Sequence, residues 1–169
     1  MEANILKRTN TISIKKYTAD DLYIIVDIWN EIIDEGNSFH WIEHLPEGKI
    51  EYILSTQTEV YCAYINKIVV GFYLLHPNSS GRCAHIANAL YAVKSDHRHK
   101  GIGKKLVEHS LEIAKKHNFK GMQYNSVVES NYSIRIYEKL GFERVGIIKN
   151  GFQNKSNEYQ NIIIFYKQL

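Results

Sequence analysis

Residues 89–108 read Ala89-Leu-Tyr-Ala-Val-Lys-Ser-Asp-His-Arg-His-Lys-Gly-Ile-Gly-Lys-Lys-Leu-Val-Glu108, and this stretch decides the fold. Its first part is apolar enough for a buried strand, its middle is a basic turn with two glycines, and its end has the spacing of an amphipathic helix. Glycines let the backbone approach a ligand closely, and the free amides at a helix N-terminus favour anions. We therefore expect a phosphate-bearing ligand at this turn.

The composition limits the class of protein. A chain of 169 residues, of which 44% are hydrophobic and 23% charged, predicts one domain over residues 1–169 with its core at about 12–169. The formal net charge of +3 is too small to predict a nucleic-acid-binding surface. The sequence has two cysteines, no apolar run of about 20 residues and no hydrophobic signal-peptide region in residues 1–8. These features favour a cytoplasmic protein without a membrane partner.

Upstream of the turn, we expect two helices and four strands. The first helix follows the capping residues Thr18–Asp21 and ends at Gly36, and the second begins at Glu47. The strands are expected at residues 12–16, 59–65, 68–75 and 83–93. Asn66-Lys67 is expected to join two of them as a tight hairpin turn, because Asn tolerates a positive φ.

Downstream of the turn, the helix is followed by a strand at residues 121–128 and a short helix that ends at Gly141. Two more strands are expected at residues 142–148 and 159–166, with a polar excursion at residues 150–157 between them. The predicted order is β-α-α-β-β-β-α-β-α-β-β. The fold class is therefore a mixed α/β (α+β) domain whose first half is antiparallel and which has a parallel crossover in the middle.

Two motifs in this frame resemble those of a known family. The turn Arg98-His-Lys-Gly-Ile-Gly103 lacks the third glycine of a Rossmann fingerprint and the upstream glycine of a Walker loop. With its flanks, Val93–Leu106, it resembles the cofactor-binding signature of the GNAT superfamily of acyl-CoA-dependent N-acetyltransferases. The segment Asn131-x5-Tyr137-Glu-Lys-Leu-Gly-Phe142 resembles the second signature of that family. The predicted element order is also the order of the family.

The resemblance implies a binding mode for acetyl-CoA, the expected cosubstrate. The pantetheine arm would lie along Tyr91, Ala92 and Val93, where the central parallel strands splay apart. Asn131 would bind this arm, and Tyr137 would act as the general acid for the departing thiolate. A plain glycine turn, an Asn131 that serves a turn or an N-cap, and a core Tyr137 are the structural alternatives. The pyrophosphate would be wrapped by Arg98, His99, Lys100, Gly101, Ile102, Gly103 and Lys104.

The acceptor side departs from the common pattern of the family. Many members carry a Glu on the strand that holds Tyr91, whereas this chain has Asn88 there and Asn125 on the next strand. These asparagines resemble a subgroup that acetylates amino-acid-like amines, and the alternative is that they only satisfy backbone groups. The base would be a water molecule, His85 or no group at all. Phe39 and Trp41 either line the acceptor pocket or pack beneath a loop.

The sequence thus predicts an enzyme, an N-acetyltransferase that transfers an acetyl group from acetyl-CoA to a primary or secondary amine of a small molecule in a ternary complex. The alternatives are protein or peptide N-terminal acetylation and a non-catalytic acyl-CoA sensor. We expect no metal, because His40 and His44 lack a third ligand. The resemblance is also compatible with a homodimer.

Overall fold

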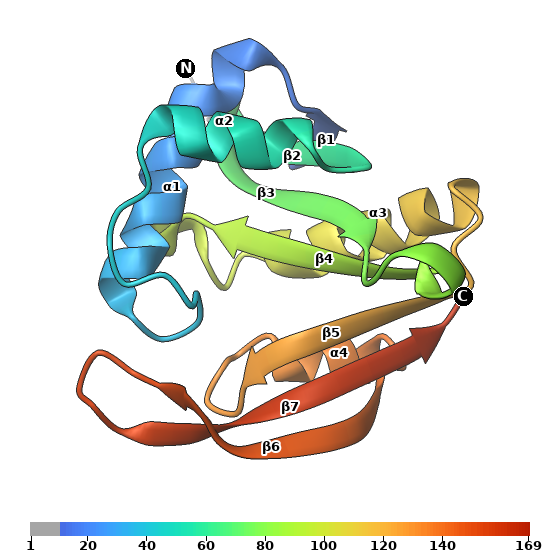
Figure 1. Cartoon of the computed structure of the whole chain (residues 1–169). Helices are drawn as coiled ribbons and strands as arrows, with labels where there is room; N and C mark the ends of the chain where they lie inside the picture. The colour runs from blue at the N-terminus through green and yellow to red at the C-terminus, as the bar shows by residue number, and fades with distance from the viewer. Residues whose placement is uncertain (1–10) are drawn as a thin grey trace, which may run out of the picture.

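A seven-stranded mixed sheet in the order β1-β2-β3-β4-β5-β7-β6 forms the centre of the computed structural model, which describes residues 11–169 (Figure 1). The helices are α1 (Leu22–Glu35), α2 (Glu47–Ser55), α3 (Ile102–Lys116) and α4 (Ile134–Lys139). The predicted order of helices and strands is confirmed. The prediction about a signal peptide concerns residues 1–8, which lie outside the described part. The strands are β1 (Ser13–Lys16), β2 (Glu59–Ile65), β3 (Ile68–Pro77), β4 (Ile86–Val93), β5 (Gly121–Val128), β6 (Glu143–Gln153) and β7 (Tyr159–Gln168).

Each face of the sheet buries its own core, because successive side chains of a strand point to opposite faces. On one face, α1 and α2 pack their apolar residues against Phe72 and Leu74 of β3. On the other face, α3 and α4 pack against Tyr73 and Leu75 of the same strand. The alternation in β3 thus divides the molecule into two apolar layers, with the sheet between them.

The hairpin turn and two helix ends have the positive φ angles that their residue types predict. Asn66 and Lys67 both have positive φ angles, 50° and 68°, as a two-residue hairpin turn requires. Gly36 ends α1 with a φ of 65°, and Gly141 follows α4 with a φ of 79°. These left-handed positions confirm the predicted hairpin and the predicted ends of both helices.

Two predicted strand boundaries were wrong by three residues or more, and the others differ by at most two. The strand expected from Cys83 begins at Ile86, because residues 81–83 form a single 3-10 turn closed by a bond from the amide of Ala84 to the carbonyl of Gly81 at 3.1 Å. The strand expected to end at residue 148 continues to Gln153, and the polar excursion is correspondingly shorter. A bulge between residues 148 and 152 keeps this extension paired with β7.

The central parallel strands separate soon after they meet, as expected. Strands β4 and β5 pair only through Ile86 with Gly121 and Ala87 with Met122, and then diverge (Figure 1). A second irregularity lies in β5, whose register with β7 shifts between Tyr124 and Val127. The divergence leaves a wedge-shaped opening in the middle of the sheet. Among the described residues, no helix is long and apolar enough to span a membrane.

Candidate active site

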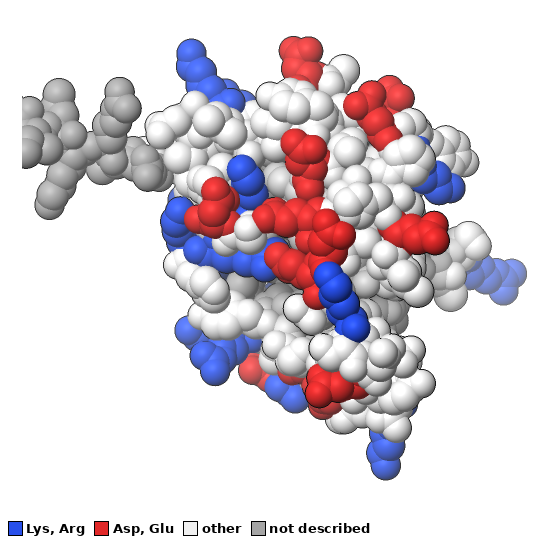
Figure 2. Space-filling view, turned by 90° about the vertical axis from the view of Figure 1, so that its left-hand side faces the viewer, with Lys and Arg blue, Asp and Glu red and all other residues white. Residues whose placement is uncertain are grey.

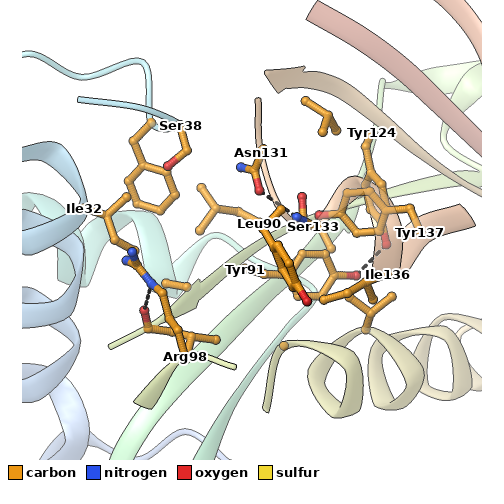
Figure 3. A pocket seen from close by; sticks show the side chains of 18 of the residues that line it. Ile32, Ser38, Leu90, Tyr91, Arg98, Tyr124, Asn131, Ser133, Ile136 and Tyr137 are labelled. Carbon is orange, nitrogen blue, oxygen red and sulfur yellow. Dashed lines mark hydrogen bonds between the residues drawn. The ribbon is translucent and has the colours of Figure 1, made fainter. Parts of the chain in front are cut away.

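A cavity of about 1060 Å³ lies between the C-terminal end of α1, the open side of β4, the N-terminal end of α3 and the segment that leads into α4. Pockets for small ligands usually enclose about 300–1,000 Å³, so this one has room for a long ligand and a small second one. Its walls include every residue that the sequence predicted for the site except Lys100. Figure 3 shows side chains of α1, β4 and the α4 region around this space.

The N-terminal end of α3 presents backbone amides to the cavity. Gly101, which precedes the helix, has a φ of 82°, and no atom lies within 4 Å of the position that a Cβ would take there. The first amides of a helix have no acceptor within the helix, and those of residues 102–104 have none elsewhere among the described residues. The helix dipole favours anions at the same end. This geometry fits the pyrophosphate that the sequence predicts here.

The two basic side chains of the turn are committed to protein groups. Arg98 Nη1 and Nη2 lie 3.0 and 2.8 Å from the carboxylate oxygens of Glu35. Its Nε donates to the carbonyl of Val93 at 3.1 Å, the bond drawn at Arg98 in Figure 3. Lys100 Nζ donates to the carbonyl of Asp96 at 2.8 Å and does not line the cavity. Both side chains therefore stabilise the turn, and Arg98 also fixes its contact with α1. The backbone amides are then the hydrogen-bond donors nearest to an anion bound at this turn.

The side of β4 that faces the opening carries unpaired amides. Two backbone hydrogen bonds mark the ends of the ladder between β3 and β4: the carbonyl of Ile86 accepts from the amide of Asn78, and the amide of Lys94 donates to the carbonyl of Val70. Since bonded and non-bonded residues alternate in an antiparallel ladder, the even-numbered residues of β4 bond to β3. The amides of Tyr91 and Val93 consequently point to the opening, and a ligand with amide groups could pair with them. Ala92 lines the cavity but turns its own amide to β3.

Three tyrosines meet where the strands diverge: Tyr124 and Tyr137 are buried and Tyr91 is partly buried. The Ser110 hydroxyl donates to the carbonyl of Val107 at 2.7 Å, so its oxygen accepts from the Tyr91 hydroxyl at 2.6 Å. The Tyr91 hydroxyl in turn accepts from the Tyr124 hydroxyl at 2.7 Å. Both of these phenol protons are therefore used inside the protein. The Tyr137 hydroxyl does not belong to this series of hydrogen bonds, and its hydrogen-bond neighbour is the Ser133 side chain.

The environment of Tyr137 keeps this phenol protonated. Burial raises the pKa of Tyr137 to about 12, and a hydrogen bond from the side chain of Ser133 opposes part of that rise. The ring lies 4.5 Å from the ring of Tyr124, centre to centre, and within the group of three shown in Figure 3. A phenol with this pKa is protonated at neutral pH and can donate a hydrogen bond, which suits a leaving thiolate.

Asn131 lies at the start of the turn that leads into α4. Its Oδ1 accepts from the backbone amide of Ser133 at 2.9 Å (Figure 3). This bond closes a turn before α4, whose N-cap is Ser133. Asn131 therefore has the turn role that was one structural alternative. Its Nδ2 has no acceptor among the described residues, and the residue lines the cavity. The turn and a contact with a ligand are therefore compatible.

Three asparagine side chains are linked across the opening. Asn78, which follows β3, accepts through its Oδ1 from Asn88 Nδ2 at 3.1 Å and from Asn125 Nδ2 at 2.6 Å. The Oδ1 atoms of the other two accept from the amide of Ala89 and from the side chain of Gln123. Each Nδ2 group retains a second N–H. Asn88 and Asn125 line the cavity, so the network fixes the orientation of both amides there.

The loop after α1 forms the outer wall of this end of the cavity. Phe39 and Trp41 line it and pack on the buried ring of Trp29, with ring centres 5.5 and 5.1 Å away. The tip of the β6–β7 hairpin closes the same corner, because the amide of Lys155 donates to the carbonyl of Gly36 at 3.2 Å. The wall is thus aromatic, and two distant segments hold it in place.

An acidic face adjoins the cavity. Figure 2 shows acidic side chains gathered on the side of the molecule where α1 lies. Asp27, Glu31, Asp34 and Glu35 recur at helical spacing on that helix. Glu35 also lines the cavity, where Arg98 binds its carboxylate, so the acidic side chains that Arg98 does not compensate lie outside the cavity, on the neighbouring turns of α1.

Some cavity residues were not predicted from the sequence. His76 and Tyr124 line the cavity, and Asn78 lies directly behind two of its side chains. His85, one of the bases considered from the sequence, does not line it. The only signal in the sequence that could have found His76 was the alternation of β3, which places it on the same face of the sheet as Phe72 and Leu74. Within residues 11–169, no cluster of three or more His, Cys, Asp or Glu side chains is arranged to hold a metal ion.

The comparisons with known proteins agree with this geometry. Residues 25–142, more than half of the chain, match the family described as Acetyltransferase (GNAT) family. The chain belongs to the GNAT family. The expected family, the expected fold and the expected class of acetyltransferase are therefore confirmed.

Relatives within the GNAT family differ in how much of their length is shared. The chain is 41% identical to N-acetyltransferase aca1 of Schizosaccharomyces pombe over 91 residues, which is 53% of this chain but only 44% of the yeast protein. It is 28% identical to an N-alpha-acetyltransferase of Saccharolobus solfataricus over 83% of this chain and 85% of that protein. A phosphinothricin acetyltransferase from Sinorhizobium meliloti, solved in complex with acetyl-CoA, has a similar fold, with a TM-score of 0.87 and 20% identity over 94% of this chain and 89% of that one.

Proposed function

We propose that this chain acts as one catalytic domain that transfers the acetyl group of acetyl-CoA to a primary or secondary amine of a small, amino-acid-like molecule in a ternary complex. The observation that carries the proposal is the continuity of the cavity. It reaches from the free amides of α3, along the open side of β4, to an aromatic and asparagine-lined end at which the sheet splays. One end suits a phosphate-bearing ligand, and the other suits a small polar molecule.

Different residues of the cavity bind different parts of acetyl-CoA. The amides of Gly101 to Lys104 bind the pyrophosphate, and the open amides of Tyr91 and Val93 align the pantetheine arm and polarise the thioester carbonyl. Asn131 contributes its free Nδ2 to the same arm. When bound, acetyl-CoA supplies the activated acetyl group. Holding the amine against that group should contribute more to the rate than any single acid or base.

Tyr137 stabilises the thiolate by donating a hydrogen bond to it. A thiol has a pKa of about 8.5 in water, whereas that of Tyr137 is about 12. Full transfer of the phenol proton is therefore unfavourable unless burial raises the pKa of the thiol as well. On this reasoning Tyr137→Phe lowers kcat by about 100-fold without abolishing it.

Acceptor amines carry a positive charge in water before they react. The acidic residues of α1 beside the entrance favour the approach of such a cation. Asn88 and Asn125 each keep an N–H, and their orientation is fixed by Asn78. They can donate to the carboxylate of an amino-acid-like acceptor. Small acceptors are also consistent with the phosphinothricin acetyltransferase that shares the fold.

Acetylation of peptide N-termini is the second candidate, and the name of the Saccharolobus relative favours it. A peptide needs an open groove to leave the site. Here Phe39 and Trp41 wall the acceptor end, and Lys155 of the hairpin bonds to Gly36 beside it. These contacts favour the small molecule.

An acceptor panel with thiol release as the readout tests the proposal. It should contain primary and secondary amino acids, simple amines and short peptides with free N-termini. We expect turnover with amino-acid-like amines, and a higher acceptor KM in Asn88→Ala and Asn125→Ala with the KM for acetyl-CoA unchanged. Tyr52→Phe, an exposed tyrosine on α2, is the control for Tyr137→Phe. Tight CoA binding without turnover of any amine would refute the proposed enzyme and support a non-catalytic acyl-CoA sensor. Turnover of peptides alone would support peptide N-terminal acetylation instead.

A further inference from the structure

His76 occupies the end of the cavity at which the acceptor is proposed to bind. It lies near the end of β3, directly opposite Asn88 of β4 in the antiparallel register. Opposed residues of such a pair place their side chains on the same face, about 5 Å apart. Both residues line the cavity, and so does Asn125. The imidazole therefore stands beside the two asparagines proposed to bind the acceptor.

The reaction needs a proton acceptor here, because an ammonium group has no lone pair with which to attack. Amide side chains such as Asn88 and Asn125 cannot take up a proton. The only carboxylate among the described lining residues is that of Glu35. It belongs to α1 and is held by both terminal nitrogens of Arg98. No carboxylate at the acceptor end is thus free for this role within the described cavity.

The hydrogen bonding of His76 determines which ring nitrogen can act. Its Nδ1 lies 2.9 Å from the carbonyl oxygen of Pro77. A carbonyl oxygen only accepts hydrogen bonds, so Nδ1 carries the proton. In the neutral ring, Nε2 then holds the lone pair, and no described residue donates to it. A backbone bond that fixes the tautomer in this way is how histidine bases are commonly oriented.

We infer that Nε2 of His76 is the proton acceptor for the amine, an inference that rests on the proposed acetyl transfer. The ammonium nitrogen of the acceptor gives one proton to Nε2, which makes the ring an imidazolium. The nitrogen lone pair then forms the N–C bond, and the C–S bond breaks with its electron pair going to sulfur, where Tyr137 donates a hydrogen bond. A second proton leaves the new amide nitrogen to water, and the imidazolium returns its proton to solvent.

The charged groups around His76 leave it free for this step. On β2, Glu59 is opposite the neighbouring Leu75, and its carboxylate is bound by Lys16 and His117. Strand β4 presents the uncharged Asn88. Across the cavity, the loop after α1 presents His40, whose ring is tilted by 32° to that of Trp41, with 3.8 Å between the ring centres.

The experiment compares pH profiles of kcat/KM for the acceptor in the wild type, His76→Gln and His76→Ala. The wild-type profile should contain an ionisation that is absent from the profile of His76→Gln. His76→Gln should also have a kcat/KM about 100-fold lower at pH 7, while its affinity for CoA is unchanged. Added imidazole should restore part of the activity of His76→Ala but not of Tyr137→Phe. His85→Gln, which alters an exposed histidine outside the cavity, is the matched control.

The failures of the two proposals are distinguishable. A wild type that binds CoA but acetylates no amine refutes the proposed function and, with it, a proton acceptor for that function. An active wild type whose pH profile survives in His76→Gln refutes the role of His76 alone. Nitrogen NMR of the CoA complex adds a readout that needs no turnover, because a neutral His76 protonated on Nε2 would also overturn the inference.

Discussion

Replacing Gly103 with alanine separates ligand binding at the N-terminal end of α3 from a purely structural role. Gly103 is the second residue of the helix, and a Cβ there would lie 3.5 Å from Ile136 Cδ1 and 4.0 Å from Val93 Cγ2. Both are ordinary contact distances. Alanine is more favourable than glycine in a helix by about 0.5–1 kcal/mol. The free variant should therefore be at least as stable as the wild type, with a Tm up to about 2–4 °C higher.

Ligand binding should change in the opposite direction. The new methyl group stands beside the amides proposed to bind the pyrophosphate, and it keeps a phosphate oxygen from at least one of them. Loss of one hydrogen bond to a charged group costs about 1.5–3 kcal/mol. This corresponds to a Kd for CoA raised roughly 10- to 100-fold. Isothermal titration with CoA measures the affinity, and thermal unfolding without ligand measures the stability.

Gly48→Ala is the matched control for this experiment. Gly48 is the second residue of α2, does not line the cavity, and has no atom within 4 Å of the position of a Cβ. It should show the same gain in stability and an unchanged Kd. If Gly103→Ala binds CoA as tightly as the wild type, the phosphates do not approach this turn. If it loses stability together with affinity, the glycine is needed for folding, and the argument from the amides fails.

Two further predictions concern stability. At Glu59, burial would raise the pKa, but hydrogen bonds from Lys16 and His117 outweigh it and lower the pKa of the folded state. Its contribution is therefore present above the unfolded pKa of about 4.3 and is lost as the pH falls through the folded value. Glu59→Gln should lower the urea midpoint at pH 7 and match the wild type only once the pH is below the lowered pKa of Glu59 in the folded state. An equal deficit at neutral pH and in acid contradicts this. Gly36→Ala should lower the free energy of unfolding by about 1–2 kcal/mol, because alanine is strained in the left-handed backbone conformation of this residue. The loss should be larger still, since the new Cβ would lie 2.6 Å from Lys155 Cβ. An unchanged urea midpoint contradicts this.

Much of the fold was predictable because its signals are local. The hairpin turn at Asn66-Lys67 and the helix ends at Gly36 and Gly141 depend on φ angles that few residue types adopt. The boundaries that were wrong depend on backbone hydrogen bonds that residue type does not reveal. The start of β4 is delayed by a single 3-10 turn at residues 81–83. Gln153 continues β6 because it pairs with Tyr159 across the hairpin, although the residues between them are polar.

The candidate site divides in the same way. The glycine turn before α3 and the spacing from Asn131 to Tyr137 are contiguous patterns, so the sequence sufficed to find them. The partners of these groups were hidden. The sequence around Arg98 predicts that it binds an anion, yet its guanidinium binds Glu35, which is 63 residues away. The sequence around Asn78 predicts only a loop, yet its Oδ1 accepts hydrogen bonds from Asn88 of β4 and Asn125 of β5.

The splay of the sheet links binding to stability. Unpaired backbone amides in a sheet are costly, and β4 loses its partner after only two residue pairs. At Ala89 the protein itself supplies a substitute, because the Asn88 side chain accepts from that amide at 2.7 Å. At Tyr91 and Val93 no described group does so. An extended ligand that bonds to these two amides takes the place of the missing strand, so the opening that weakens the free sheet is also what makes it bind. The same pairing would return stability to the sheet when the ligand binds.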